Sequence, residues 1–479
     1  MAGELRRSSG PATGKTKCRY KVKDQITIMP LAVIMLLVMV SLTWVLPRRL
    51  AFCPLLILTC LMPLGQEIIL FGLHFPLFRV VLLVGVLRAL VKGEAAQLRW
   101  IRLDKLFAWW TLVTVVFGTL AEPSMELFVA RAGDAYTAIG SYFFFRSVVV
   151  DLEDIVTAIK TLALASLPLA ACMVVEGSTG HNPFAAFGGV PEISPMREGH
   201  VRCQGAFRHC ILAGTFGATL VPLCLGLWLY RPQSRRVAVA GLIASLVITV
   251  AARSSGALLA IAAGVGGLMF WKWRRYLRLL RWGMVVAIIG LSLVMNAPVW
   301  YLIAKLSSFT GGGGWHRAWL ITQAVDHFDQ WWLFGTTYTA NWGPAGEVIA
   351  ANPKMMDITN QYIMEGVKGG VLKLGLFFAI IVVCFRGIGR SIQMNGTEPS
   401  TGLFIWALGA TLLAHCLSFI SVTYFDQIIV IWYWLLAAIG LVISNSDRSF
   451  AAVGVMDEGL EEPHPVQVVE ACESGQEAS

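Results

Sequence analysis

The chain has 479 residues, of which 56% are hydrophobic and 14% are charged, and its formal net charge is +9. Soluble domains carry roughly 25% charged residues, so this composition argues against an ordinary soluble enzyme and favours a membrane protein. The positive charge is spread over short connections, as in membrane proteins, and we expect no nucleic-acid partner. The ten cysteines form no CxxC pair and no Cys/His ligand pattern, so we expect neither a metal site nor a cofactor.

The N-terminal segment, residues 1–27, is polar and basic and predicts a disordered tail. No small-residue cleavage site follows it, so it does not match a cleaved signal peptide. Apolar runs of about 15–23 residues then recur, each able to cross a hydrocarbon core roughly 30 Å thick as a helix. The candidate spans are 28–46, 50–65, 77–91, 106–121, 136–150, 157–175, 209–230, 237–252, 255–273, 282–298, 370–386, 402–421 and 427–444.

These runs predict an all-α polytopic membrane protein of about 12–13 transmembrane helices. The predicted organisation has five parts, of which the N-terminal tail is the first; the other four follow it. They are transmembrane helices over 28–298 with an external loop at 176–207, a large external loop at 299–369, further transmembrane helices at 370–444, and a disordered, acidic cytoplasmic tail at 445–479.

Lysine and arginine are concentrated in a set of connections between spans. These connections fall on one side of the membrane if successive spans run in opposite directions, and the bias assigns that side to the cytoplasm. The basic connections are 48–49, 92–105, 231–236, 272–281 and 386–390. The loops 122–135, 176–207 and 299–369 then share the opposite side. Thirteen spans would place the basic N-terminus on that outer side, which the same rule disfavours. Two alternatives stay open: an outer N-terminus, or a re-entrant or interfacial segment around Gln66 to His74.

Residues 311–375 form the longest stretch that is too polar for lipid, and it lies between strongly apolar segments. Within it, 316–330 carries apolar residues at helical spacing, which predicts an amphipathic helix on the membrane surface. The segment 357–368 also has a helical pattern, with Asp357 or Thr359 as the expected cap. This stretch is the candidate location for chemistry on a polar substrate.

Three arginines lie on the predicted outer side, against the usual charge bias: Arg202, Arg253 and Arg317. A guanidinium offers a planar fork of donors that binds phosphate or carboxylate oxygens in pairs. The alternative is an arginine that only reaches the lipid headgroups. Because all three stand beside Gly-rich or Ser-rich turns, we favour recognition of an oxyanion.

A carboxylate or an imidazole in the same region could act as general base on a sugar hydroxyl. The nearby acids are Asp326, Asp329, Glu347, Asp357 and Glu365, the histidines are His316 and His327, and the amides are Asn360 and Gln361. Arg146 is expected to pair with Asp151 or Glu153 as scaffolding. His415 and Asp426 are expected to be hydrogen-bonding groups within the helix bundle.

Three stretches resemble the bacterial O-antigen ligase and Wzy-type polymerase superfamily, and together they place the likeness over residues 140–440. The first is RCQGAFRHCILAGTFGATLVPL, and the second is AARSSGALLA, with Arg253 at the family's arginine. The third is WHRAWLITQAVDHFDQWWLFG followed by TNQYIMEGVKGGVLKLGLF.

The resemblance implies a GT-C-like, metal-independent, inverting glycosyltransferase at the outer, periplasmic face of the bacterial inner membrane. Its donor would be a glycan on undecaprenyl diphosphate, and a flippase and a chain-length regulator would be its protein partners. The catalytic candidates are Arg253, Arg317, Asp357 and His316. The substrate-binding candidates are Arg202, Asn360, Gln361, Tyr362 and Glu365.

The chain departs from the family at Thr359, where the ligases carry a histidine. Threonine cannot act as a base near neutral pH, so the base would be Asp357, His316 or His327. This departure favours a repeat-unit polymerase over an O-antigen ligase. A secondary transporter of an organic anion is the alternative from another class, although the two halves of the chain show no internal repeat.

Overall fold

The computed structural model describes residues 29–70, 73–308, 314–343, 348–349, 352–394 and 398–458. The predicted disordered N-terminus, Glu347 and residues 459–479 of the predicted tail lie outside these residues. Within them, a helix lies over each predicted span. These helices are α1 (Pro30–Val45), α2 (Cys53–Leu61), α3 (Leu77–Val91), α4 (Arg102–Ala121), α5 (Met125–Val148), α6 (Leu152–Thr179), α7 (Cys210–Tyr230), α8 (Arg235–Ala251), α9 (Ser255–Met269), α10 (Leu277–Val294), α14 (Gln361–Met394), α15 (Pro399–Ser418) and α16 (Gln427–Glu458).

The described chain is mostly helical, and eight of its helical stretches are long and apolar enough to cross a membrane, with α9 and α10 counted as one stretch. This is the architecture expected of a polytopic membrane protein. The finer count of about 12–13 spans stays a prediction. Helix α2 has nine residues and rises only about 13 Å, which is less than half of a hydrocarbon core roughly 30 Å thick.

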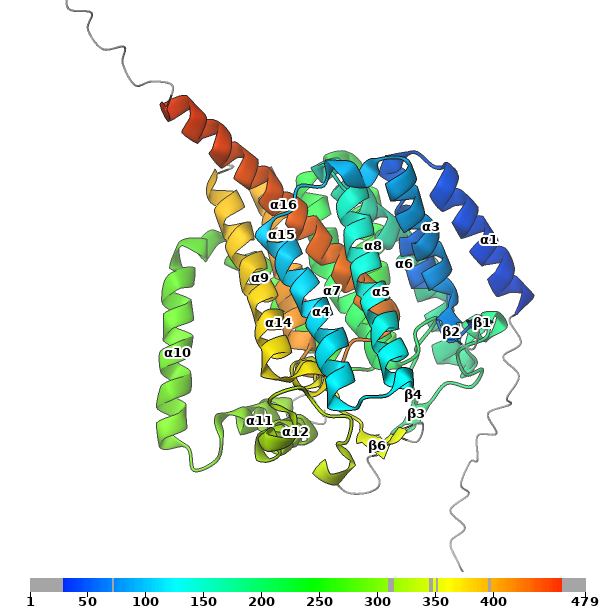
Figure 1. Ribbon diagram of the computed structural model, residues 1–479, viewed down its shortest axis with the longest axis vertical. Coiled ribbons are helices and arrows are strands. Elements are labelled where there is room, and N and C mark those ends of the chain that lie inside the picture. The colour runs from blue at the N-terminus through cyan, green and yellow to red at the C-terminus, as the bar shows by residue number, and fades with distance from the viewer. Residues whose placement is uncertain are drawn as a thin grey trace, which may run out of the picture.

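Most of the helices pack into one bundle, and α10 stands apart from it (Figure 1). No residue of α10 is buried, and its leucine, valine and isoleucine side chains are exposed. An apolar helix of this kind is stable only where lipid or another protein covers it, which agrees with a membrane-embedded chain.

Three short β-hairpins interrupt the helical pattern, and the sequence analysis did not predict them. They pair β1 (Glu67–Leu70) with β2 (Leu73–Pro76), β3 (Met196–Arg197) with β4 (His200–Val201), and β5 (Val348–Ile349) with β6 (Asn352–Met356). All three lie in connections between helices. The first covers the segment for which an interfacial position was one of the two alternatives.

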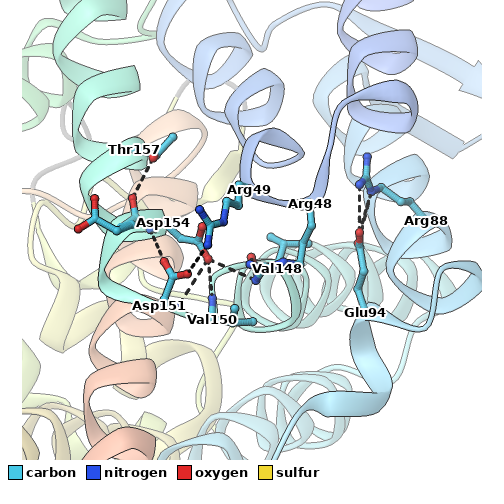
Figure 2. Close-up of polar contacts among 10 residues, drawn as sticks. Arg48, Arg49, Arg88, Glu94, Val148, Val150, Asp151, Asp154 and Thr157 are labelled. Carbon is cyan, nitrogen blue, oxygen red and sulfur yellow. Dashed lines mark hydrogen bonds and ion pairs between the residues drawn. The ribbon is translucent and has the colours of Figure 1, made fainter.

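Salt bridges join several basic connections at one end of the bundle. Arg48 and Arg49 precede α2, and their guanidinium groups lie 3.3 Å from the carboxylates of Asp154 and Asp151 respectively (Figure 2). Asp151 also caps α6, since its side chain accepts a hydrogen bond from the Asp154 N–H at 2.8 Å. Arg231, which follows α7, pairs with Glu153.

The predicted partners of Arg146 are wrong. Its Nε lies 3.0 Å from Oδ1 of Asp104, and both side chains are almost fully buried. The reason is that Asp151 is already engaged in capping α6, whereas Asp104 on α4 faces Arg146 on α5. Arg146 is therefore scaffolding, as expected, but between other helices.

The connections predicted to be external lie together at the opposite end, with the hairpins and the amphipathic helices (Figure 1). Those helices are α11 (Leu302–Ser308), α12 (Gly314–Asp326) and α13 (Phe328–Trp331). The Cys203 N–H donates to the Ala251 carbonyl at 3.2 Å, which joins the loop 176–207 to the end of α8. The segment predicted as one amphipathic helix at 316–330 forms two helices in the structure, α12 and α13.

The first described residue also lies at this end. The Met29 N–H donates to Oε1 of Gln66 at 3.1 Å, and the Gln66 side chain lies against Gly188 in the loop 176–207. The described part of the chain thus begins at the end of the bundle where the predicted external loops lie.

Two predicted boundaries are wrong because helices extend past them. Helix α5 begins at Met125 inside the predicted loop 122–135, with Ser124 as its cap. Helix α16 runs to Glu458, well into the predicted tail. The predicted boundary between the helix at 357–368 and the span from 370 is confirmed, since α14 consists of two helical parts that meet at a kink at Gly369 and Gly370. The cap of α14 is Asn360, whose Oδ1 accepts from the Ile363 N–H, and not Asp357 or Thr359.

Candidate functional site

Arg253 lies in the tight turn between α8 and α9, and its backbone is left-handed, with φ of 47°. This conformation is uncommon for a residue other than glycine, and an isolated case costs about 1–3 kcal/mol. Such strain persists where the surrounding structure fixes the backbone, and it is concentrated at functional sites. The Arg253 side chain is exposed.

A groove of about 700 Å³ runs past Arg253 between α6, α8 and α9. Its polar part contains Arg253, Ser254 and Ser255. Its apolar part contains Val174, Val250 and Leu258, which are 55%, 66% and 51% exposed. Exposed apolar side chains on membrane-spanning helices face lipid. The groove therefore has a positively charged end at Arg253 and a wall that faces lipid. This combination fits an amphiphile with an anionic headgroup.

Arg317 on α12 approaches the start of α9 from a distant part of the chain. A Cβ placed on Gly256 would lie 3.5 Å from Nη2 of Arg317 and 2.4 Å from Oγ of Ser421. Glycine therefore leaves the space that the guanidinium and the serine occupy. Burial lowers the pKa of Arg317 from its ordinary value, but an arginine stays charged at neutral pH. Arg317 therefore lies against the first turn of α9, which directly follows the turn that carries Arg253.

Arg202 lies in the loop that precedes α7, near two titratable groups. Burial lowers the pKa of His209, the charge of Arg202 lowers it further, and the charge of Asp357 raises it. These three side chains are therefore close enough to interact electrostatically. His209 also caps α7, since its Nδ1 accepts from the Ile211 N–H at 3.1 Å, and a neutral imidazole is required for that hydrogen bond. Among the described residues, Nε of Arg202 is buried without a hydrogen-bond partner.

Glu176, which the sequence analysis did not single out, holds the loop that carries Arg202. Its buried carboxylate accepts hydrogen bonds from Oγ of Ser194 at 2.7 Å and from the N–H groups of Gln204 and Gly205 at 2.8 Å each. An ionised carboxylate that accepts several hydrogen bonds makes a strong structural anchor. Glu176 sits at the end of an apolar helix, and nothing in the sequence shows that a loop packs over it.

The three candidate bases differ in their surroundings. His327 is engaged in structure, because its Nδ1 lies 2.9 Å from the Gln323 carbonyl and its ring stacks on Trp342. His316 is half-buried and packs against Trp319, with ring centroids 5.6 Å apart. Asp357 is exposed and lies in the electrostatic environment of Arg202 and His209. Asp357 therefore acts on the same imidazole as Arg202, that of His209.

The predicted substrate-binding residues after Thr359 divide into two groups. Asn360 is 2% exposed and caps α14, and Oη of Tyr362 donates to the Cys416 carbonyl at 3.0 Å. These two side chains therefore hold the fold. Gln361 and Glu365, in contrast, line a second cavity that is distinct from the groove at Arg253.

The second cavity has a volume of about 170 Å³ and lies among α3, α4, α5, α14 and α16. On its inner wall, Glu365 accepts from Nε1 of Trp110 at 2.9 Å and from Nε2 of Gln361 at 2.6 Å. Nζ of Lys373 lies 3.1 Å from the same carboxylate. Trp110 and Lys373 were not among the predicted site residues. Each stands in an apolar run. The packing of α4 against α14 brings Trp110 to Glu365, whereas Lys373 lies further along α14 than Glu365, past the kink at Gly369 and Gly370.

The connection between α15 and α16, residues 419–426, separates the two regions. Ser421 lies against Gly256 on the side of Arg317, whereas Tyr424 and Asp426 line the second cavity. The Tyr424 N–H donates to Oε1 of Gln361 at 2.7 Å. A ligand bound at the arginines and a ligand bound in the cavity would therefore be neighbours across one loop.

In the part of the chain that the structure describes, no group of three or more His, Cys, Asp or Glu side chains is placed to hold a metal ion. No protein-family model matches the chain, and no curated protein is significantly similar to it. The functional assignment therefore depends on the residues themselves.

Proposed function

We propose that the protein is a membrane glycosyltransferase that polymerises undecaprenyl-diphosphate-linked oligosaccharide repeat units into exopolysaccharide or O-antigen. It would act at the periplasmic face of the bacterial inner membrane. One observation carries the proposal: Arg317 on α12 approaches Gly256 at the start of α9, three residues after Arg253, and Arg253 lines a groove with a lipid-facing wall. A lipid diphosphate needs both features, a cationic site for its phosphates and an apolar path for its chain.

In the proposed reaction, a hydroxyl group of the acceptor sugar attacks the anomeric carbon of the donor. The new glycosidic C–O bond forms as the bond to the diphosphate breaks, with inversion at that carbon, and the undecaprenyl diphosphate leaves with the electron pair. Arg253 and Arg317 would offset the negative charge that develops on the leaving group, a role in which fixed positive charge has its largest effect on rate. The two guanidinium groups supply that charge, so the proposal needs no metal ion.

The acceptor hydroxyl must lose a proton, and we assign Asp357 as the general base. Asp357 is exposed near Arg202 and His209, whereas His327 is engaged by Gln323 and Trp342. His316 stays the second candidate, because it precedes Arg317 directly. Arg202 would bind a further phosphate or carboxylate oxygen of the substrate.

Replacing Arg253 or Arg317 with Ala should abolish long-chain polymer in cells that depend on this protein. Loss of one preorganised donor to a developing oxyanion costs about 10²–10³ in rate. The measurement is the size distribution of cell-surface polysaccharide, with protein in the membrane fraction checked by immunoblot. Arg197→Ala is the matched control, since Arg197 is 58% exposed and pairs with its neighbour Glu198. Normal polymer from both site variants would refute the proposal.

Replacing Asp357 with Asn should reduce the polymerisation rate by about 10²–10⁴, the usual contribution of a general base. His327→Gln should leave the rate nearly unchanged. Both rates can be measured on membranes supplied with lipid-linked repeat units. The reverse pattern would assign the base to His327, and an unchanged rate in both variants would direct the search to His316.

A secondary transporter of an organic anion is the second candidate, and one observation favours it. Helix α14 breaks at Gly369 and Gly370, close to the buried Glu365–Lys373 pair, and transporters bind substrates at broken helices. Uptake of a labelled organic acid into proteoliposomes, absent from liposomes without protein, would support this function. An O-antigen ligase is distinguished by its product, which would carry the glycan on a lipid acceptor rather than on undecaprenyl diphosphate.

A further inference from the structure

The cavity beside Glu365 has the size and the lining of a site for one sugar ring. A cavity of about 150 Å³ can hold a benzene molecule, so about 170 Å³ with an open mouth accommodates one six-membered ring. Aromatic and hydroxyl side chains share the wall with charged ones. They include Trp110, Phe425, Tyr433, Thr111, Thr114 and Thr137. Aromatic faces and convergent polar groups together are typical of small-molecule sites.

The inner wall is fixed before any ligand arrives. Glu365 is held by Trp110, Gln361 and Lys373, and Nζ of Lys373 also lies 5.2 Å from the centroid of the Trp110 ring. The Lys373 ammonium group has three N–H donors, and one of them suffices for Glu365. The remaining donors can serve a ligand that enters the cavity.

The mouth has charged groups that are paired only loosely. Oδ2 of Asp134 lies 3.7 Å from Nζ of Lys368 and 3.8 Å from Nη1 of Arg131, which are distances beyond a hydrogen bond. The Asp134 side chain is 48% exposed and that of Lys368 is 32% exposed. Within the described residues, Nε of Arg131 is buried and makes no hydrogen bond. Asp134 and Lys368 therefore keep hydrogen-bonding capacity for a ligand.

The charges of this cluster favour an anionic ligand. Three cations, Arg79, Lys368 and Lys373, and three acids, Asp134, Glu365 and Asp426, line the cavity. A further cation, Arg131, lies 3.8 Å from Asp134. Asp426 lies 3.8 Å from another cation, Arg208. The described side chains thus leave a positive excess, and a carboxylate on the ligand would offset it.

We propose that this cavity binds one sugar ring that carries a carboxylate, with Lys368 at the mouth as the residue that binds the acid group. The cavity lies on one side of the connection 419–426, and Arg317 with Gly256 lies on the other side. The bound ring is then the acidic sugar of the acceptor chain, an assignment that rests on the proposed function. The binding of an acidic sugar does not depend on it.

The test uses the full-length protein in detergent and two matched pairs of probes: methyl glucuronide with methyl glucoside, and methyl galacturonide with methyl galactoside. Binding is followed by saturation-transfer NMR. At least one acid should bind about tenfold or more tightly than its neutral partner, the usual gain from a charge-assisted hydrogen bond. Lys368→Gln should remove that preference, and Lys368→Arg should keep it.

Lys354→Gln is the matched control and should keep the preference. Lys354 is 59% exposed and pairs with Glu122 outside the cavity. Equal binding of acid and neutral sugars, no binding of either acid, or an equal loss in the Lys354 and Lys368 variants would overturn the inference.

The failure of this inference can be told apart from the failure of the proposed function. Arg317→Ala should stop polymerisation and leave the binding of the acidic probe unchanged. Polymerisation by a wild-type protein that binds no acidic sugar would refute the cavity assignment alone. Binding of the acidic sugar by a protein that forms no polymer from any lipid-linked repeat unit would instead support the transporter.

Discussion

Lys373→Met should lower the free energy of unfolding by about 3–5 kcal/mol, the usual cost of removing one partner from a buried ion pair. The side chains of Lys373 and Glu365 are only 2% and 3% exposed. Methionine fills a similar volume but leaves the almost fully buried Glu365 carboxylate without its cation. The measurement is thermal or denaturant unfolding of the detergent-solubilised protein.

The double variant Glu365→Gln/Lys373→Met should recover most of that stability, because it leaves no uncompensated buried charge. Lys368→Met is a matched single variant, since Lys368 is partly exposed and ion pairs of this kind contribute about 0–1 kcal/mol. A double variant as unstable as Lys373→Met would show that the pair is not the source of the effect. The recovery is incomplete, because Trp110 and Gln361 donate to different oxygens of Glu365 and the amide keeps only one acceptor oxygen.

Gly370→Ala should destabilise the protein by about 2–6 kcal/mol, the sum of backbone strain and overpacking. The φ of Gly370 is 70°, and an added Cβ would lie 2.1 Å from the Leu333 carbonyl oxygen. Two hydrogen bonds join these segments: the Val371 N–H donates to Trp332 at 2.9 Å, and the Thr336 N–H donates to Val367 at 2.8 Å. The alanine would therefore force apart α14 and the segment that follows α13.

The same variant should also lose activity, because that segment continues from α12, which carries Arg317. Gly375→Ala is the matched control on the same helix, since nothing lies within 4 Å of its added Cβ. Alanine is favoured over glycine inside a helix by roughly 0.5–1 kcal/mol, so this control should be neutral or slightly stabilised. Equal melting temperatures for the two variants would contradict the role assigned to the break in α14.

The sequence predicted what depends on local pattern. Apolar runs located the helices, and alternation with the Lys/Arg bias grouped Arg202, Arg253 and Arg317 at one end. In the structure, the side chain of Arg317 approaches Gly256 at the start of α9, which is consistent with that grouping. The division of α14 was also predicted, since the expected helix at 357–368 and the expected span from 370 meet at Gly369 and Gly370. Its two glycines have non-helical backbones only because the segment after α13 inserts there.

The sequence could not predict groups that become partners only through packing between helices. Trp110 and Glu365 are joined by a hydrogen bond across 255 positions in the chain. The sequence pattern of neither α4 nor α14 indicates that these two helices pack against each other. Arg146 illustrates the same limit, since the acids nearest in sequence were the predicted partners and Asp104 on another helix is the observed one. Glu176 is a third case, because its three donors come from a loop without periodic pattern.

The central claim is that Arg253 and Arg317 form a metal-independent site for a lipid diphosphate donor. The most direct measurement incubates the purified protein with undecaprenyl-diphosphate oligosaccharide, with and without EDTA, and separates the products by size on a gel. The account predicts a ladder of products that persists in EDTA and disappears in Arg317→Ala. A ladder that disappears in EDTA, or one that Arg317→Ala forms as well as the wild type, would contradict it.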